Sequence, residues 1–352
     1  MDPQAHFDLA EEIARLKHAI DTNDLGRVKS LMTNYPALHR APMGYRDNGP
    51  LTWVAECRVP WEPPGPVRLA MAQWMIGDGS DVHQGGDGPL MRAALNGERI
   101  AMMELLVANG ADVNAEWDGY FPILFSPCET VDPVALNWLL EHGANPNCAR
   151  AGRKFPDDAL DYVIQSYSRT PKLAACIDLL LKAGGRTRYN IPPVFDFLRG
   201  RVDLLAGHLD ADPSLVARRF SDLDFGSTAM RGLTLRGGTL LHVAAEYCNA
   251  EAARLLLDRG ADVDARGDAY GQTPLFHAAS QFGNAGIEVV RLLADRGAHL
   301  SIRANVPGRF GAGEFVEGTA LEYASRFPGG DERHAGRLNN RETIELLASR
   351  AR

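Results

Sequence analysis

The chain has 352 residues, 45% of them hydrophobic and 23% charged, with a formal net charge of −8. This composition is typical of soluble proteins, and the acidic balance excludes a general nucleic-acid-binding protein, which needs Lys and Arg to neutralise phosphates. No segment approaches the roughly 20 apolar residues of a membrane span, and the polar start Met1–His6 lacks the apolar core of a signal peptide.

The cysteines predict a reducing compartment. There are five of them, an odd number, and no two form a C-x-x-C pair. A disulfide framework or a zinc site is therefore not expected, and a cytoplasmic location is favoured.

A short phrase that ends in glycine recurs along the chain. Leu255–Val263 reads LLLDRGADV, and Leu292–Leu300 reads LLADRGAHL, so that the two glycines lie 37 residues apart. A period in that range predicts a stack of small helical units. Each phrase predicts a helix ending, because the Leu pair packs inward and the glycine adopts the left-handed conformation after the last turn. Looser copies occur at 74–82, 105–114, 139–147 and 179–185.

Helix starts precede several of these endings. The clearest is Thr273-Pro274-Leu275, followed by His277 and two alanines. Threonine suits the capping position, and proline suits the first helical position, where its missing N–H costs nothing. The segments that begin at Thr239 and Thr319 repeat the theme.

These motifs resemble the ankyrin repeat, a unit of about 33 residues with a β-turn and two helices. The resemblance is strong in 237–303, good in 87–148, and weaker in 49–84, 156–188, 191–218 and 317–352. It implies an all-α fold, namely a solenoid of helix-turn-helix units with β-turn or hairpin fingers and several long loop insertions. We expect one array of about nine units over 1–352, with an N-terminal cap at 1–41, internal repeats over 49–303 and a C-terminal cap at 317–352.

Insertions interrupt the pattern at several places, and insertions in a solenoid often lie on the binding face. Long loops in a compact protein tend to be functional or disordered. Three separate the helices of a unit, and three lengthen the fingers between units: 57–66, 166–172 and 327–340, then 148–155, 219–237 and 303–317.

No standard catalytic motif is present, and no two histidines have the i, i+4 spacing of a helical metal pair. The sequence therefore predicts no catalytic residue, no metal and no cofactor. The resemblance implies that His242 and His277 occupy or neighbour the family's histidine position, where the side chain bonds backbone and links neighbouring turns.

The resemblance also implies where a ligand would bind, namely at the finger tips and at the exposed end of the first helix of each unit. Carried over where the motif is legible, these positions form an acidic and aromatic groove: Glu56, Trp117, Asp118, Tyr120, Glu129, Glu246, Tyr247 and Tyr270. Aromatic residues are the usual anchors of interfaces. Carboxylates beside them suit a cationic peptide segment or a carbohydrate.

The favoured function is a non-catalytic scaffold that binds a protein or peptide through the concave groove and the finger loops, without nucleic acid or membrane. The alternative is a glycoside-hydrolase-like enzyme, in which two opposed carboxylates cleave a sugar in an aromatic groove closed by the insertions. Its candidate carboxylates are Asp118, Glu129, Glu246, Asp268 and Glu317. A role as a structural or assembly subunit is the third option.

Overall fold

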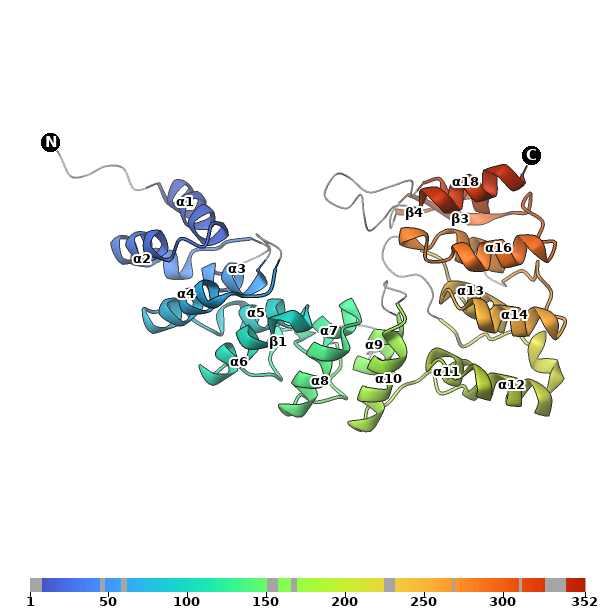
Figure 1. Ribbon diagram of the computed structural model, residues 1–352, viewed down its shortest axis with the longest axis horizontal. Helices are drawn as coiled ribbons and strands as arrows, with labels where there is room; N and C mark the ends of the chain where they lie inside the picture. The colour runs from blue at the N-terminus through green and yellow to red at the C-terminus, as the bar shows by residue number, and fades with distance from the viewer. Residues whose placement is uncertain are drawn as a thin grey trace. The chain divides into compact units, whose positions relative to one another are not determined.

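The computed structural model describes residues 8–44, 48–57, 62–150, 158–165, 170–224, 232–267, 270–309, 312–326 and 340–351. For residues 308–309 and 312–313 it describes the backbone alone. The chain divides into two compact units (Figure 1). Unit 1 comprises Met1–Val163 and Ala175–Arg186, and unit 2 comprises Ile164–Ala174 and Thr187–Arg352.

Unit 1 consists of antiparallel helix pairs and one short hairpin (Figure 1). Its elements in chain order are α1 (Leu9–Asp21), α2 (Leu25–Asn34), η1 (Pro36–Arg40), α3 (Pro50–Glu56), α4 (Pro66–Gly77), α5 (Gln84–Ala93), η2 (Gly97–Arg99), α6 (Ile100–Ala108), β1 (Glu116–Trp117), β2 (Phe121–Pro122), α7 (Phe125–Thr130) and α8 (Pro133–Glu141). The division between the units passes through α9 (Ala159–Gln165) and α10 (Leu173–Lys182).

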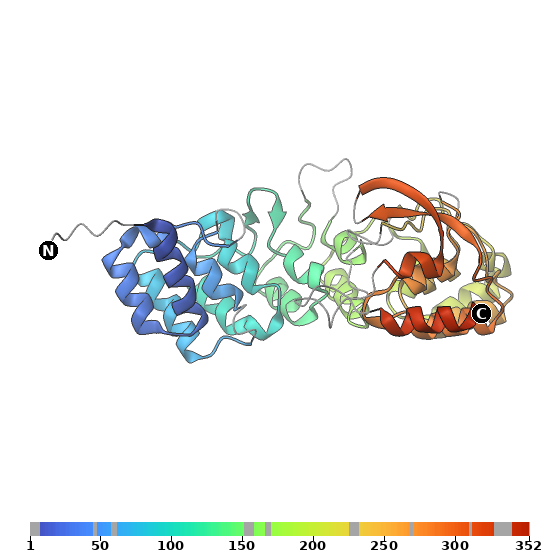
Figure 2. The ribbon, with the colours of Figure 1, turned by 90° about the horizontal axis from the view of Figure 1, so that it is seen from above.

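Unit 2 repeats the helix pairs and adds a longer hairpin, visible as the two orange strands in Figure 2. Its elements are α11 (Pro192–Leu198), α12 (Val202–Ala211), η3 (Pro213–Val216), α13 (Leu240–Glu246), α14 (Ala250–Asp258), α15 (Pro274–Ala279), η4 (Phe282–Asn284), α16 (Ile287–Asp295), β3 (Arg303–Arg309), β4 (Ala312–Thr319), α17 (Ala320–Ala324) and α18 (Arg341–Arg350).

Within each unit the helices form two layers. In unit 2 the first helices of successive pairs, α13, α15 and α17, contact one another, and the second helices, α12, α14, α16 and α18, form a parallel row behind them. Unit 1 has the same arrangement, with α1, α3 and α5 in one row and α2, α4 and α6 in the other. Small residues allow the first row to pack closely, since Ala244, Ala245, Ala278 and Ala279 are fully buried. The helix-pair architecture expected from the sequence is therefore present.

The helices begin and end as the motifs predict. α15 begins at Pro274 with Thr273 as its N-cap residue, and α17 begins after Thr319, whose Oγ1 accepts a hydrogen bond from Glu322 N at 3.1 Å. The helix-ending glycines Gly260 and Gly297 both have φ of +88°. This left-handed conformation is open to glycine and disfavours other residues.

An asparagine side chain in each of two finger bases of unit 1 ties neighbouring repeats together. Asn114 accepts a hydrogen bond from Asn145 N at 2.8 Å and donates one to Gly143 O at 3.0 Å. Asn147 bonds Arg186 N and Gly184 O of the next repeat in the same way, each at 3.0 Å. These bonds join the turn after one helix pair to the turn after the next.

The sequence predicts one continuous array over 1–352. Because the chain divides into two compact units, this array stays a prediction. Parts of the predicted insertions lie outside the described residues, namely Trp61 and the segments 151–155, 166–169, 225–231 and 327–339.

Candidate functional site

The structure places the eight predicted groove residues in two sets. Glu56, Trp117, Asp118, Tyr120 and Glu129 belong to unit 1, and Glu246, Tyr247 and Tyr270 belong to unit 2. Three of the eight are buried, namely Glu56, Trp117 and Glu246. Of the other five, Asp118 is exposed and the remaining four are half-buried.

Trp117 packs beneath its own finger, so the expectation of an exposed groove aromatic is wrong here. The residue is 7% exposed, and its Nε1 donates to Asn48 Oδ1 at 3.2 Å. The β1–β2 hairpin lies directly on the turn at Gly85 and Gly86, where a Cβ on Gly86 would come within 2.5 Å of Glu116 O. This close approach brings the indole inside.

The tip of the same finger is accessible. Asp118 is exposed, with a left-handed φ of +54° and its N–H donating to Gly85 O at 3.0 Å. Tyr120 is half-buried, and the Arg150 guanidinium lies 5.6 Å from its ring centroid. The aspartate and the tyrosine are therefore held at a defined tip by backbone contacts.

Two glutamates of unit 1 are less accessible than expected. Glu56, at the end of α3, is 7% exposed and lies 3.8 Å from Arg92 Nη1, which provides a counter-charge for the buried carboxylate. This corrects the expectation of a solvated groove carboxylate. Glu129 on α7 is half-buried.

Glu246 is fully buried, which also contradicts the predicted groove position. Its Oε2 lies 2.8 Å from His277 Nδ1, and both side chains are 0% exposed. The physical reason is the position of the histidine. His277 lies four residues after Thr273, whereas His242 lies three residues after Thr239, and one residue rotates a side chain by about 100° around a helix axis. The imidazole therefore meets the carboxylate on the neighbouring α13.

His242 fulfils the role that the resemblance implies. Its Nδ1 accepts a hydrogen bond from Thr239 N at 3.0 Å, and its Nε2 donates to Gln272 O of the next repeat at 3.1 Å. Burial, reinforced by the nearby His277, lowers the pKa of His242 to about 3. His277 does not follow that pattern, because it bonds the Glu246 carboxylate, and its Nε2 has no hydrogen-bond partner among the described residues.

The two remaining tyrosines of unit 2 are half-buried. The Tyr247 hydroxyl donates to Ile164 O at 2.7 Å, so this side chain links α13 to α9. Tyr270 stacks on Phe315 of β4, with ring centroids 4.2 Å apart and planes 16° from parallel. Tyr270 therefore belongs to a larger aromatic feature on the second finger.

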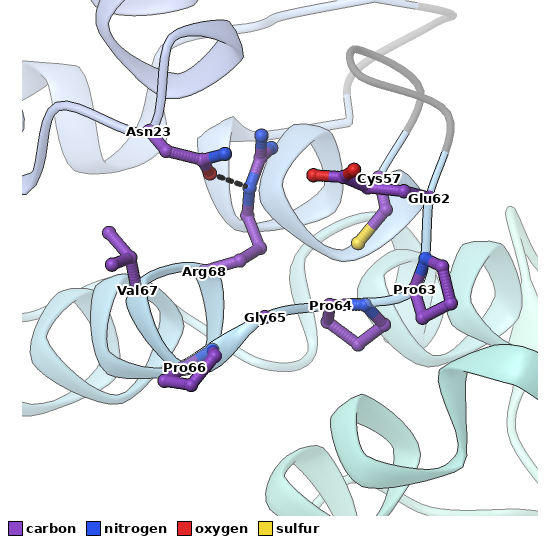
Figure 3. Close-up of a pocket in the computed structure, with 9 residues that line it drawn as sticks. All are labelled: Asn23, Cys57, Glu62, Pro63, Pro64, Gly65, Pro66, Val67 and Arg68. Carbon is purple, nitrogen blue, oxygen red and sulfur yellow. Dashed lines mark hydrogen bonds between the residues drawn. The ribbon is translucent and has the colours of Figure 1, made fainter.

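A cavity of about 150 Å³ lies between Cys57, residues 62–65 and the first turn of α4 (Figure 3). Arg68 is 4% exposed, and its Nε donates to Asn23 Oδ1 at 2.8 Å. The Cys57 thiol also lines the cavity. Burial raises its pKa, and the charges of Arg99 and Arg68 offset only part of that shift, so the thiol stays protonated and weakly nucleophilic at neutral pH. The lining residues are Asn23, Cys57, Glu62, Pro63, Pro64, Gly65, Pro66, Val67 and Arg68.

The carboxylates proposed for the enzyme alternative do not line this cavity. Glu246 is committed to His277, Glu317 lies 3.6 Å from Arg303 Nε, and Asp268 is outside the described residues. Over the described ranges, no group of three or more His, Cys, Asp or Glu side chains has the arrangement of a metal site. Across the same part of the chain, no helix has the length and apolar character needed to cross a membrane.

One exposed feature was missed by the sequence reasoning. Phe315 and Val316 on β4 are 41% and 40% exposed, between the exposed Glu314 and Glu317. The available signal was the run Glu-Phe-Val-Glu within an insertion otherwise rich in glycine.

Comparison with known protein families gives two matches. A model that describes three copies of the ankyrin repeat matches residues 206–304, and a single ankyrin repeat matches residues 85–118. The first range runs from within α12 through α16 of unit 2, and the second runs from within α5 through β1 of unit 1. No curated protein matches the chain.

Proposed function

Since the chain is an ankyrin repeat protein, and such repeats generally mediate protein–protein interaction, we propose that it is a non-catalytic scaffold that binds a protein or peptide through its groove and finger loops. The observation that supports the finger loops is the accessibility of their tips. Asp118 is exposed, and Tyr120 and Tyr270 keep part of their rings accessible. A carboxylate beside aromatic rings suits a cationic partner segment.

The buried members of the predicted set have a supporting role in this proposal. Glu56, Trp117 and Glu246 hold the helix pairs and the finger base in place, so a partner meets the residues above them. The proposal includes the single array of about nine units. It also includes a cytoplasmic location, since all five cysteines are free thiols.

The test compares partner recovery by matched variants of the full chain. We expect Asp118→Ala with Tyr120→Ala to lose proteins that the unmodified chain recovers, as measured by quantitative mass spectrometry after affinity capture. The control carries Glu104→Ala and Glu141→Ala, which remove two exposed side chains from α6 and from the end of α8. Equal recovery by all three proteins would overturn the role of the finger.

A further inference from the structure

The β3–β4 hairpin of unit 2 (Figures 1 and 2) has two outer edges. The edge on β3 is occupied by hydrogen bonds from neighbouring segments. On β3, Asn305 N donates to Tyr270 O at 3.0 Å, and Asn305 O accepts from Gln272 Nε2 at 2.8 Å. Further along, Arg326 Nη1 donates to Pro307 O. The preceding finger and Arg326, two residues after the end of α17, therefore cover the outward backbone groups of β3.

The outward bonds of Asn305 on β3, together with the strand register, show which backbone groups of β4 point away from β3. In an antiparallel ladder, residues alternate between pairs that bond each other and pairs whose N–H and C=O groups point away from the partner strand. Asn305 points away from β4, so its opposite residue Glu317 points away from β3, and the same holds for Phe315 opposite Pro307. Proline suits this position, since it has no N–H to donate.

The outward groups of Phe315 have no backbone partner in the part of the chain that the structure describes. Among the described residues, no hydrogen bond reaches the outward N–H or C=O of Phe315 or the N–H of Glu317. The open stretch ends at Glu317 O, which accepts from Arg303 Nη2 at 3.1 Å. An open strand edge is a template for another extended chain.

The side chains around this edge define the chemistry of such a chain. Glu314 and Val316 project on one face of β4, and Phe315 and Glu317 on the other, since alternate residues of a strand share a face. Each face thus offers one carboxylate and one exposed apolar group. Phe315 is held in place by its stack on Tyr270.

We propose that the outer edge of β4 binds an extended, basic peptide segment of a partner protein by strand addition. Main-chain hydrogen bonds to Phe315 and Glu317 give affinity, and alternating Lys or Arg and β-branched side chains give specificity. A second copy of this chain fits the edge poorly, because it would bring the carboxylates of both copies along one seam. The inference rests on the proposed scaffold function and specifies one site for it.

The probe is a fluorescein-labelled peptide, Lys-Val-Lys-Val-Lys-Val-Lys, titrated with the full chain and followed by fluorescence anisotropy. The matched peptide with Glu in place of Lys tests the charge. Two N-methylated versions of the basic peptide, methylated on alternate sets of residues, test the backbone. We expect saturable binding of the basic peptide, loss of binding for one methylated set only, and no binding of the acidic peptide.

On the protein side, Glu317→Pro removes the outward N–H and leaves the bonds between β3 and β4 in place. Glu317→Gln is its control, because it removes the same charge and keeps the N–H. We expect the proline variant to bind roughly tenfold more weakly than the glutamine variant, the change expected for one lost hydrogen bond at the upper end of its usual value. The methylated peptides are measured on the unmodified chain, so their result is independent of the folding of any variant.

Equal binding of both methylated peptides, or no binding of the basic peptide, would overturn strand addition at β4. Capture that still depends on Asp118 and Tyr120 would then leave the scaffold function intact. Loss of that dependence as well would remove the proposed function itself.

Discussion

Two regions of unit 2 reverse the usual distribution of polar and apolar side chains. Between α13 and α15, a carboxylate and two imidazoles are fully enclosed, as Glu246, His242 and His277 are at most 1% exposed. On β4, Phe315 and Val316 are about two-fifths exposed. Enclosed polar groups that bond each other hold neighbouring repeats in a fixed arrangement. Exposed apolar groups on an open strand edge do nothing for that arrangement, and they suit recognition.

The largest expected effect would break the first half of this comparison. Glu246→Ala leaves the His277 Nδ1 group buried without its partner, and we expect the free energy of unfolding to fall by about 3 kcal/mol, the upper end of the cost of an unsatisfied buried polar group. Urea denaturation followed by circular dichroism measures it. Glu251→Ala, at an exposed position on α14, is the control and is expected to change little. A loss below about 1 kcal/mol would contradict a structural role for the pair.

The second effect concerns pH. The pKa of His242 is lowered to about 3 in the folded chain, against about 6.5 when unfolded, so the unfolded chain binds an extra proton between these values. The contribution of His242 to the free energy of unfolding is therefore fully present above pH 6.5 and decreases as the pH falls below that value. We expect a loss of about 2 kcal/mol between pH 7.5 and pH 5 from this residue. His242→Gln should show a shallower pH dependence, and an unchanged slope would refute the assignment.

A smaller effect separates the two half-buried tyrosines of unit 2, because among the described residues only the hydroxyl of Tyr247 has a hydrogen bond to the backbone. Tyr247→Phe removes the hydroxyl that bonds Ile164 O and keeps the ring. We expect a loss of about 1 kcal/mol, the net value of one hydrogen bond. Tyr270→Phe keeps the stack on Phe315, and thermal melting of the two variants should rank Tyr247→Phe as the less stable. The reverse order would show that the hydrogen bond from the Tyr247 hydroxyl to Ile164 O does not stabilise the fold.

The smallest effect sharpens the second half of the comparison. Val306 and Val316 lie directly opposite each other in the hairpin, with exposures of 0% and 40%. Val316→Thr should change the free energy of unfolding by less than about 0.5 kcal/mol. Val306→Thr buries a hydroxyl and should cost about 1–3 kcal/mol. Equal losses in urea denaturation would mean that the Val316 side chain is as well covered as that of Val306.

The sequence was sufficient to predict features that depend on a few adjacent residues. Thr273 and Pro274 mark a helix start, and Gly260 and Gly297 mark helix ends, because capping and positive φ are local requirements. The ankyrin repeats at 85–118 and 206–304 follow from the same motifs. The positions of the individual helix pairs were predictable for the same reason.

The candidate site was predicted less well, because exposure depends on residues distant in the chain. The position of Glu246 in the repeat motif predicted an exposed side chain. In the structure His277 of the next repeat covers it. Trp117 is covered through Asn48 and the Gly85–Gly86 turn. The open edge of β4 depends on the contact between Tyr270 and Asn305, which no pattern within β4 indicates.

The asparagines in the finger bases make the spacing of the repeats independent of the number of residues between them. Asn114 reaches a carbonyl 29 residues away, and Asn147 reaches the equivalent carbonyl 37 residues away, both at 3.0 Å. Eight additional residues in the second interval therefore leave the pitch at this bond unchanged. A fixed pitch with variable loops allows insertions such as the β3–β4 hairpin to be acquired, lost or exchanged while the helices on either side keep their register.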